Sequence, residues 1–205
     1  QKMLAAMIYR LDRDVGKILN ALDDQGLSEE TIVFFCSDNG PHNQEGIDPG
    51  FFRSSGPFRG IKRDLYEGGI RSPMIVRWKG KIQPGQTSDQ VWAAWDVFPT
   101  LTELAGLKVP LGLDGESMVE PLLNGKIKKH APLYWEFHEK GFHQAARMGD
   151  WKAVRHGVDA SLELYDLSID PGETQDVSSS NRRMIKKIES YLASARSDSR
   201  EWPLP

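Results

Sequence analysis

Three polar side chains in the first third of the sequence have the types and positions to bind an anion with the help of a metal ion. Asp38 and Asn39 directly follow an apolar run at residues 32–36, and Lys62 lies further along in a glycine-rich segment. An adjacent Asp and Asn offer an anionic and a neutral oxygen, which suit calcium or magnesium better than zinc. The lysine ammonium is a compact charge for an anionic oxygen. Together they predict a site for an oxyanion ester.

A simpler interpretation of these residues stays open. Asn39-Gly40 is a strong hairpin signal, and a loop lysine is often only a solvated charge. A hairpin needs a partner strand at once, however, and residues 41–46 do not have a strand pattern. Two ligands also cannot complete a metal site, so further oxygens must come from elsewhere.

Composition excludes several classes of protein. The chain of 205 residues has a net charge of -3, which provides no general attraction for nucleic acid or an anionic membrane. No apolar run approaches the roughly 18 residues of a membrane span. The single cysteine, Cys36, excludes a disulfide framework within the chain. Its apolar surroundings favour a small buried hydrophobe over a nucleophile.

The polar residues sit in an α/β pattern. Residues 4–22 have helical periodicity and end at Gly26, whereas 32–36 and 72–78 are typical of short strands covered on both faces. Two further short helices are expected near 97–105 and 117–123. The long loop 41–69 lies between the two strands, and loops of that length are usually functional. Since the first helix has no cap before it, we expect the chain to be the back portion of a longer protein.

The C-terminal residues change character. Strand-like runs at 133–137, 144–149, 151–156 and 162–167 precede an amphipathic helix at 182–195. We therefore expect an α/β domain over residues 1–125, and a small α+β subdomain with an antiparallel sheet over residues 126–205.

Longer motifs add a family resemblance. The strings "SDNGPH", "GPFRGIKRDLYEGGIRSPMIVRWKGKI", "DVFPTLTELAG", "LDGESMVEPLL" and "ELYDLSIDPGETQDV" resemble the type I sulfatases of the alkaline-phosphatase superfamily. The match covers nearly the whole chain, in order and spacing. It implies the C-terminal part of an alkaline-phosphatase-like domain, whose mixed or parallel sheet is flanked by helices.

The resemblance also implies roles for individual residues. Asp38 and Asn39 correspond to calcium ligands, and Lys62 to the lysine that contacts the sulfate near the leaving oxygen. The remaining candidates for substrate binding are His42, Arg59, His138 and His143. Arg63 and Arg71 are further candidates for pairing with sulfate or carboxylate, although Arg71 can equally serve the fold.

The family's nucleophile is a formylglycine made from Cys or Ser in a Cys/Ser-X-Pro/Ala-X-Arg motif. Cys36 does not fit, because Ser37-Asp38-Asn39-Gly40 follows it. We expect the motif to be missing from this chain and the nucleophile to lie in an N-terminal part outside it. The expected protein is a sulfuric ester hydrolase of sulfated carbohydrate or aryl sulfate, while this chain alone is expected to be inactive. The resemblance further implies a formylglycine-generating maturation enzyme and a periplasmic, secreted or lysosomal location.

Two alternatives remain. A phosphoesterase or phosphotransferase of the same superfamily would share the metal at the strand end, but its zinc-type members are expected to have Asp-His where this chain has Asp38-Asn39. A non-catalytic module that binds sulfated glycans needs no nucleophile at all.

Overall fold

The computed structural model describes residues 1–139 and 141–205, which form an α/β structure of two compact units. One unit contains residues 36–73 and 131–205, and the other contains 2–35 and 74–130. The units alternate along the sequence because part of the N-terminal half packs with C-terminal residues. The boundary expected between residues 125 and 126 stays a prediction.

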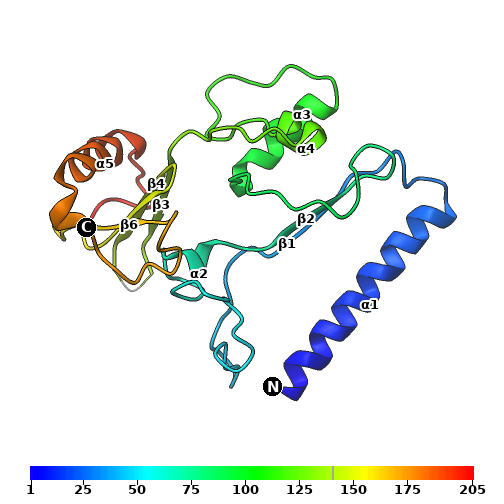
Figure 1. Cartoon of the computed structure of the whole chain (residues 1–205), viewed down its shortest axis with the longest axis horizontal. Helices are drawn as coiled ribbons and strands as arrows, with labels where there is room; N and C mark the ends of the chain where they lie inside the picture. Colours follow the sequence, from blue (N-terminus) through cyan, green and yellow to red (C-terminus); the bar gives the residue numbers. More distant parts are fainter. Residues whose placement is uncertain (140) are drawn as a thin grey trace. The chain divides into compact units, whose positions relative to one another are not determined.

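The first unit is built on a four-stranded antiparallel sheet (Figure 1). Its strands are β3 (Leu133–Phe137), β4 (His143–Met148), β5 (Trp151–His156) and β6 (Glu163–Asp166), paired in that order. Helix α5 (Arg182–Ala195) lies against one face of this sheet and buries Ile188 and Leu192 on Ala146 and Ala153. The predicted antiparallel sheet and C-terminal helix are thus confirmed.

The sheet also carries the segment that surrounds Lys62. Leu65 and Tyr66 pack on Ala145, Val154 and Tyr165 in a separate core cluster. The one-turn helix α2 (Glu67–Ile70) follows immediately and is buried at its first three residues. Apolar burial of this kind, at roughly 1.5–3 kcal/mol for each large side chain, fixes the glycine-rich segment against the C-terminal sheet.

The second unit contains α1 (Lys2–Asp24) and most of the two-stranded sheet of β1 (Val33–Cys36) and β2 (Met74–Arg77). It also contains the short helices α3 (Val97–Leu104) and α4 (Val119–Asn124), which were expected from the sequence, and η1 (Ala94–Asp96), which was not. Gly26 ends the α1 region with a φ of +68°, a conformation that glycine adopts without cost. The remaining helix, η2 (Ser178–Ser180), belongs to the first unit.

Two predictions about the strand before Asp38 are wrong for this structure. Residues 32–36 were expected to be covered on both faces, yet Phe35 is 38% exposed and Ile75 of β2 is 63% exposed. Cys36 is exposed as well, not a small buried hydrophobe. The reason is that, in the part of the chain that the structure describes, β1 and β2 pair only with each other. Among the same residues, no helix has the length and apolar character to cross a membrane.

Candidate active site

Asp38 and Asn39 lie just beyond the end of β1. The Ser37 hydroxyl donates to the Asn39 carbonyl at 2.9 Å, and Nδ2 of Asn39 donates to the Gly40 carbonyl at the same distance. Since the amide nitrogen of Asn39 is engaged, its Oδ1 is the atom left to accept a ligand. The exposed Asp38 carboxylate has no hydrogen bond or ion pair to any described residue.

Two backbone hydrogen bonds fasten this strand end to the Lys62 segment. The Gly40 amide donates to the Gly69 carbonyl at 2.8 Å, and the Lys62 amide donates to the Pro41 carbonyl at 2.8 Å. Glycine is required for this approach, because a Cβ on Gly40 would lie 1.9 Å from the Gly68 carbonyl oxygen. Asn39-Gly40 is therefore not the turn of a hairpin, and the segments that carry Asp38 and Lys62 are held together.

A cavity of about 320 Å³ opens beside Lys62. The Lys62 ammonium has no hydrogen-bond or ion-pair partner among residues 1–139 and 141–205, so its charge is available to a ligand. Arg63, in contrast, is paired with Glu139 at 2.7 Å. The cavity is lined by Asn43, Gln44, Ile61, Lys62, Arg63, Asp64, Glu139 and His143.

Of the predicted substrate-binding histidines, only His143 lines a described cavity. His42 is half-buried in the loop after the metal candidates, where its Nδ1 accepts a hydrogen bond from the Gln44 amide at 3.2 Å. His138 contacts Glu136 at 3.2 Å, and its ring stacks near Trp202. His143 and Lys62 therefore line the same cavity, whereas His138 contacts Trp202 near the C-terminus.

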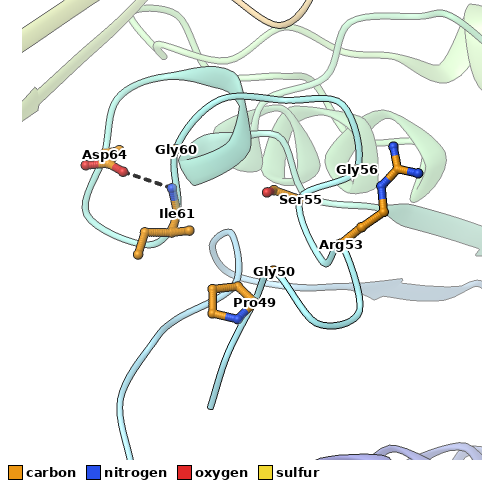
Figure 2. Close-up of a pocket in the computed structure, with 8 residues that line it drawn as sticks. All are labelled: Pro49, Gly50, Arg53, Ser55, Gly56, Gly60, Ile61 and Asp64. Carbon is orange, nitrogen blue, oxygen red and sulfur yellow. Dashed lines mark hydrogen bonds between the residues drawn. The ribbon is translucent and has the colours of Figure 1, made fainter. Parts of the chain in front are cut away.

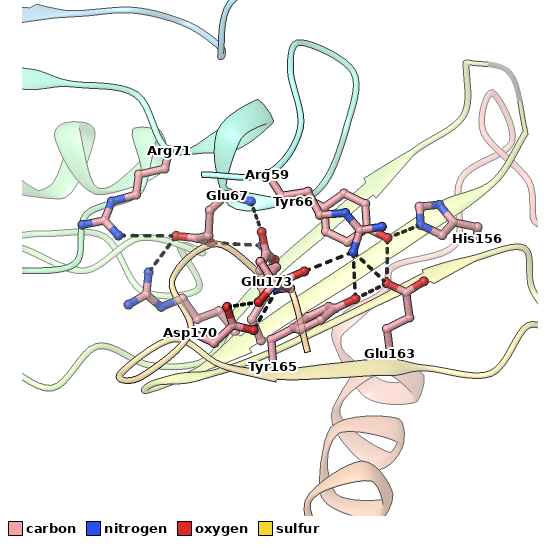
Figure 3. A network of polar contacts seen from close by, with 12 residues as sticks. Arg59, Tyr66, Glu67, Arg71, His156, Glu163, Tyr165, Asp170 and Glu173 are labelled. Carbon is pink, nitrogen blue, oxygen red and sulfur yellow. Dashed lines mark hydrogen bonds and ion pairs between the residues drawn. The ribbon is translucent and has the colours of Figure 1, made fainter. Parts of the chain in front are cut away.

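Arg59 is engaged by the sheet and is not open to the cavity (Figure 3). Its guanidinium lies 3.8 Å from the centre of the Tyr66 ring and donates to the Tyr165 hydroxyl at 3.0 Å. It also donates to the Glu173 carbonyl at 3.2 Å. These contacts give Arg59 a part in joining the glycine-rich segment to β6.

A second hollow shares Ile61 and Asp64 with the cavity beside Lys62 (Figure 2). Its remaining lining comes from the loop at residues 49–56 and from Gly60. The Asp64 carboxylate accepts the Ile61 amide at 2.9 Å and so closes the turn before Tyr66. Ile61 and Asp64 of this turn therefore line both hollows.

Comparison with known proteins decides the family. The sulfatase family model matches residues 4–107, and the model for the C-terminal part of N-sulphoglucosamine sulphohydrolase matches residues 59–198. The chain belongs to the sulfatase family. The resemblance inferred from the motifs is confirmed, as is the fold class.

Individual relatives are longer than this sulfatase chain. The steryl-sulfatase of Mus musculus is 37% identical over 152 residues, a match that covers 72% of this chain and 24% of that protein. The N-acetylgalactosamine-6-O-sulfatase of Bacteroides thetaiotaomicron is 30% identical over 214 residues, covering 93% and 41%. A solved structure of Ps i-CgsB in complex with k-i-k-neocarrahexaose is 30% identical with a TM-score of 0.80, covering 94% and 43%. The chain spans less than half the length of each.

The donor set of this sulfatase chain fits a hard cation. Both candidate ligands are oxygens, the Asp38 carboxylate and the side-chain Oδ1 of Asn39, and neither has a hydrogen-bond or ion-pair partner among the described residues. Among the described residues, no group of three or more His, Cys, Asp or Glu side chains has the geometry for a metal ion. The two oxygens therefore supply only part of the coordination shell that calcium prefers.

The expectation that the formylglycine motif is missing from this chain is wrong for its bare spacing, which occurs once, at Ser55-Gly56-Pro57-Phe58-Arg59. Ser55 lines the second hollow, and its carbonyl accepts the Phe58 amide at 3.1 Å in a turn. The arginine of this stretch is the same Arg59 that stacks on Tyr66.

A buried ion-pair cluster next to helix α2 was not predicted from the sequence (Figure 3). The Lys152 ammonium, fully buried in β5, lies 3.0 Å from Glu67 and 3.3 Å from Glu173. The Glu173 carboxylate also accepts the backbone amide of Glu67 at 2.6 Å. Burial raises the pKa of Glu173, although the Lys152 charge and the Glu67 amide oppose that rise. In the sequence, the only indication of this cluster is Lys152, a charged residue within the apolar pattern of a strand.

Proposed function

We propose that this chain supplies the calcium ligands and the sulfate-binding lysine of a sulfuric ester hydrolase. The observation that carries the proposal is the backbone link that holds the Asp38-Asn39 strand end against the unpaired Lys62. Membership of the sulfatase family supports the reaction class. The substrate is a sulfated carbohydrate or an aryl sulfate, in line with the names of the relatives.

Each residue has a defined part in this proposal. Asp38 and Asn39 would hold calcium, which when bound draws charge from the sulfate oxygens. The Lys62 ammonium would offset the negative charge that develops on the departing alcohol oxygen. This assistance matters most for sugar esters, because an alkoxide is a poorer leaving group than a phenolate. The cavity beside Lys62 would receive the group that carries the sulfate.

The formylglycine nucleophile and the other calcium ligands would come from residues outside this chain. A separate maturation enzyme would make the formylglycine, and the complete protein would work in a periplasmic, secreted or lysosomal compartment. The short share of each relative that the chain covers supports this division of the active site. The chain alone is then expected to bind sulfate without hydrolysing its esters.

The test compares the chain with the complete enzyme on 4-nitrophenyl sulfate and 4-nitrophenyl phosphate. We expect sulfate hydrolysis only by the complete enzyme, its loss after chelation, and its recovery with added calcium. Asp38→Asn should raise the calcium concentration needed for recovery about tenfold or more, since it removes an anionic ligand. The matched variant Asp159→Asn changes an exposed carboxylate that contacts no described residue, and should behave like the wild type.

Three results would count against the proposal. Preferred hydrolysis of the phosphate ester by the complete enzyme would favour a phosphoesterase. Binding of sulfated sugar by the complete protein without turnover would favour a glycan-binding module. Turnover by this chain alone would place the nucleophile within it, and peptide mass spectrometry of Ser55 would then show the loss of two hydrogen atoms that converts serine to formylglycine.

A further inference from the structure

An unbroken line of hydrogen bonds runs from a carboxylate on β6 to the cavity beside Lys62. Oε2 of Glu163 accepts the Tyr66 hydroxyl at 2.6 Å, and the Tyr66 oxygen lies 3.0 Å from Nε2 of His156 (Figure 3). Nδ1 of His156 in turn lies 2.8 Å from Nδ1 of His143, which lines the cavity. All four residues belong to the sheet unit.

The direction of each hydrogen bond follows from the carboxylate end. A carboxylate only accepts, so the single hydroxyl proton of Tyr66 points to Glu163. Burial and the Glu163 carboxylate raise the pKa of Tyr66, so it keeps that proton across the physiological pH range. The Tyr66 oxygen must therefore accept a hydrogen bond from the N–H at Nε2 of His156.

The same logic sets the tautomers of both histidines. A neutral His156 that carries its proton on Nε2 has a bare Nδ1, which is an acceptor. His143 must then carry its proton on Nδ1 and donate it to His156. Nε2 of His143 is left as a bare acceptor, and no described residue bonds to it. Burial, and then the neighbouring His156, lower the pKa of His143, which keeps the ring neutral.

We infer that Nε2 of His143 accepts a hydrogen bond from a hydroxyl or amide N–H of the substrate, which makes the substrate a sulfated sugar and not a bare aryl sulfate. The inference rests on the proposed function and deepens it. Lys62 in the same cavity is a donor only and has no partner among the described residues, so it suits the anionic group, whereas His143 suits a neutral donor beside it. His156, Tyr66 and Glu163 are positioning residues that set the tautomer.

The tautomer is measured directly by long-range ¹H–¹⁵N correlation of the His143 and His156 rings in the complete protein. We expect His143 with its proton on Nδ1 and His156 with its proton on Nε2. Tyr66→Phe removes the acceptor of His156 and should allow both tautomers of His143. The matched control is Tyr165→Phe, which also deletes a 2.6 Å bond to Glu163 but leaves His156 untouched. A wild-type His143 with its proton on Nε2 would overturn the inference.

The substrate class is tested with N-acetylgalactosamine 6-sulfate and analogues in which each hydroxyl, or the acetylamino group, is replaced by hydrogen in turn. In the wild type, one replacement should lower kcat/KM about tenfold or more, because it leaves the His143 acceptor unpaired. In His143→Leu, removing the same substrate group should not change kcat/KM. In His143→Gln, which retains an acceptor, removing that group should still lower kcat/KM, but by less than in the wild type. If every analogue lost equal activity in the wild type and in His143→Leu, the inference would be wrong.

Failure of this inference can be told from failure of the proposed function. If the wild type hydrolyses neither 4-nitrophenyl sulfate nor any sugar sulfate, the proposed function fails. The tautomer spectrum then remains as the test of whether Nε2 of His143 is a hydrogen-bond acceptor. If the wild type hydrolyses 4-nitrophenyl sulfate and ignores each change in the sugar, the proposed function stands and the assignment of the sugar contact to His143 falls.

Discussion

The backbone amide of Lys62 donates a 2.8 Å hydrogen bond to the carbonyl oxygen of Pro41. This bond joins two segments whose side chains have complementary chemistry, the oxygens after β1 and the unpaired ammonium. Backbone bonds hold this spacing more rigidly than side-chain contacts would, because they leave only the Lys62 side chain to move. Such fixed positioning is what proximity effects in catalysis require.

Gly40→Ala is expected to damage both stability and activity. The new Cβ would meet the Gly68 carbonyl oxygen at 1.9 Å, and backbone cannot move aside as a flexible side chain can. We expect the free energy of unfolding to fall by about 2 kcal/mol and kcat/KM to fall about 100-fold as Asp38 shifts from Lys62. Denaturant unfolding and aryl sulfate kinetics of the complete enzyme measure the two effects.

Gly16→Ala is the matched control for this substitution. Gly16 lies within α1, and a Cβ there has nothing within 4 Å. Alanine in a helix interior should stabilise the protein by roughly 0.5–1 kcal/mol relative to glycine. If both variants behaved alike, the close contact at Gly40 would not be the cause.

The extent to which sequence predicts this structure varies with the kind of feature. Helix α5 and the strands β3 to β6 are close to their predicted bounds, because apolar periodicity reports which face an element buries. The exposure of β1 and of Cys36 was predicted wrongly, since burial depends on neighbours that no local pattern reveals. The same limit hid the partner of His143, which is His156, 13 residues away, and the partner of His156, which is Tyr66, 90 residues away.

Lys152→Met is expected to be strongly destabilising. It removes the ammonium that lies between the carboxylates of Glu67 and Glu173, all three being 2% exposed or less. Breaking a buried ion pair from one side costs about 3–5 kcal/mol, although a further rise in the pKa of Glu173 would relieve part of it. The free energy of unfolding at pH 7 is the measurement. Lys17→Met, at an exposed pair with Asp14 on α1, should change the free energy of unfolding far less than Lys152→Met.

Asp96→Ala should destabilise the other unit. This fully buried carboxylate accepts the backbone amides of Ala93 at 2.7 Å and Glu116 at 2.8 Å, and it contacts Nε2 of His130 at 2.8 Å. Removing it leaves these buried donors unsatisfied, which costs about 1–3 kcal/mol for each orphaned group. We expect amide hydrogen exchange at Ala93 and Glu116 to accelerate. Asp89→Ala, at an exposed residue, should leave that exchange unchanged, and a similar acceleration there would contradict the role of Asp96.

Asp170→Asn should reduce stability in a manner that depends on pH. Burial opposes ionisation of Asp170, but hydrogen bonds from the Gln175 amide and from the hydroxyl and amide of Thr174 outweigh it and lower the pKa below its usual 3.8. A carboxyl group with a lowered pKa in the folded state stabilises the fold above its unfolded pKa, and this contribution is lost as the pH falls through the lower folded value. The variant should therefore be less stable by about 1 kcal/mol at pH 7, and the difference from wild type should shrink below about pH 4.

Denaturant unfolding between about pH 3 and pH 7 measures this difference for Asp170→Asn. Asp159→Asn serves as the control, because Asp159 is exposed and has no partner among the described residues, so its difference from wild type should stay near zero at every pH. The turn at Asp170 leads directly into Glu173, whose carboxylate holds the Glu67 amide. A loss of stability for Asp170→Asn that stayed constant down to about pH 3 would mean that ionisation of Asp170 does not stabilise this turn.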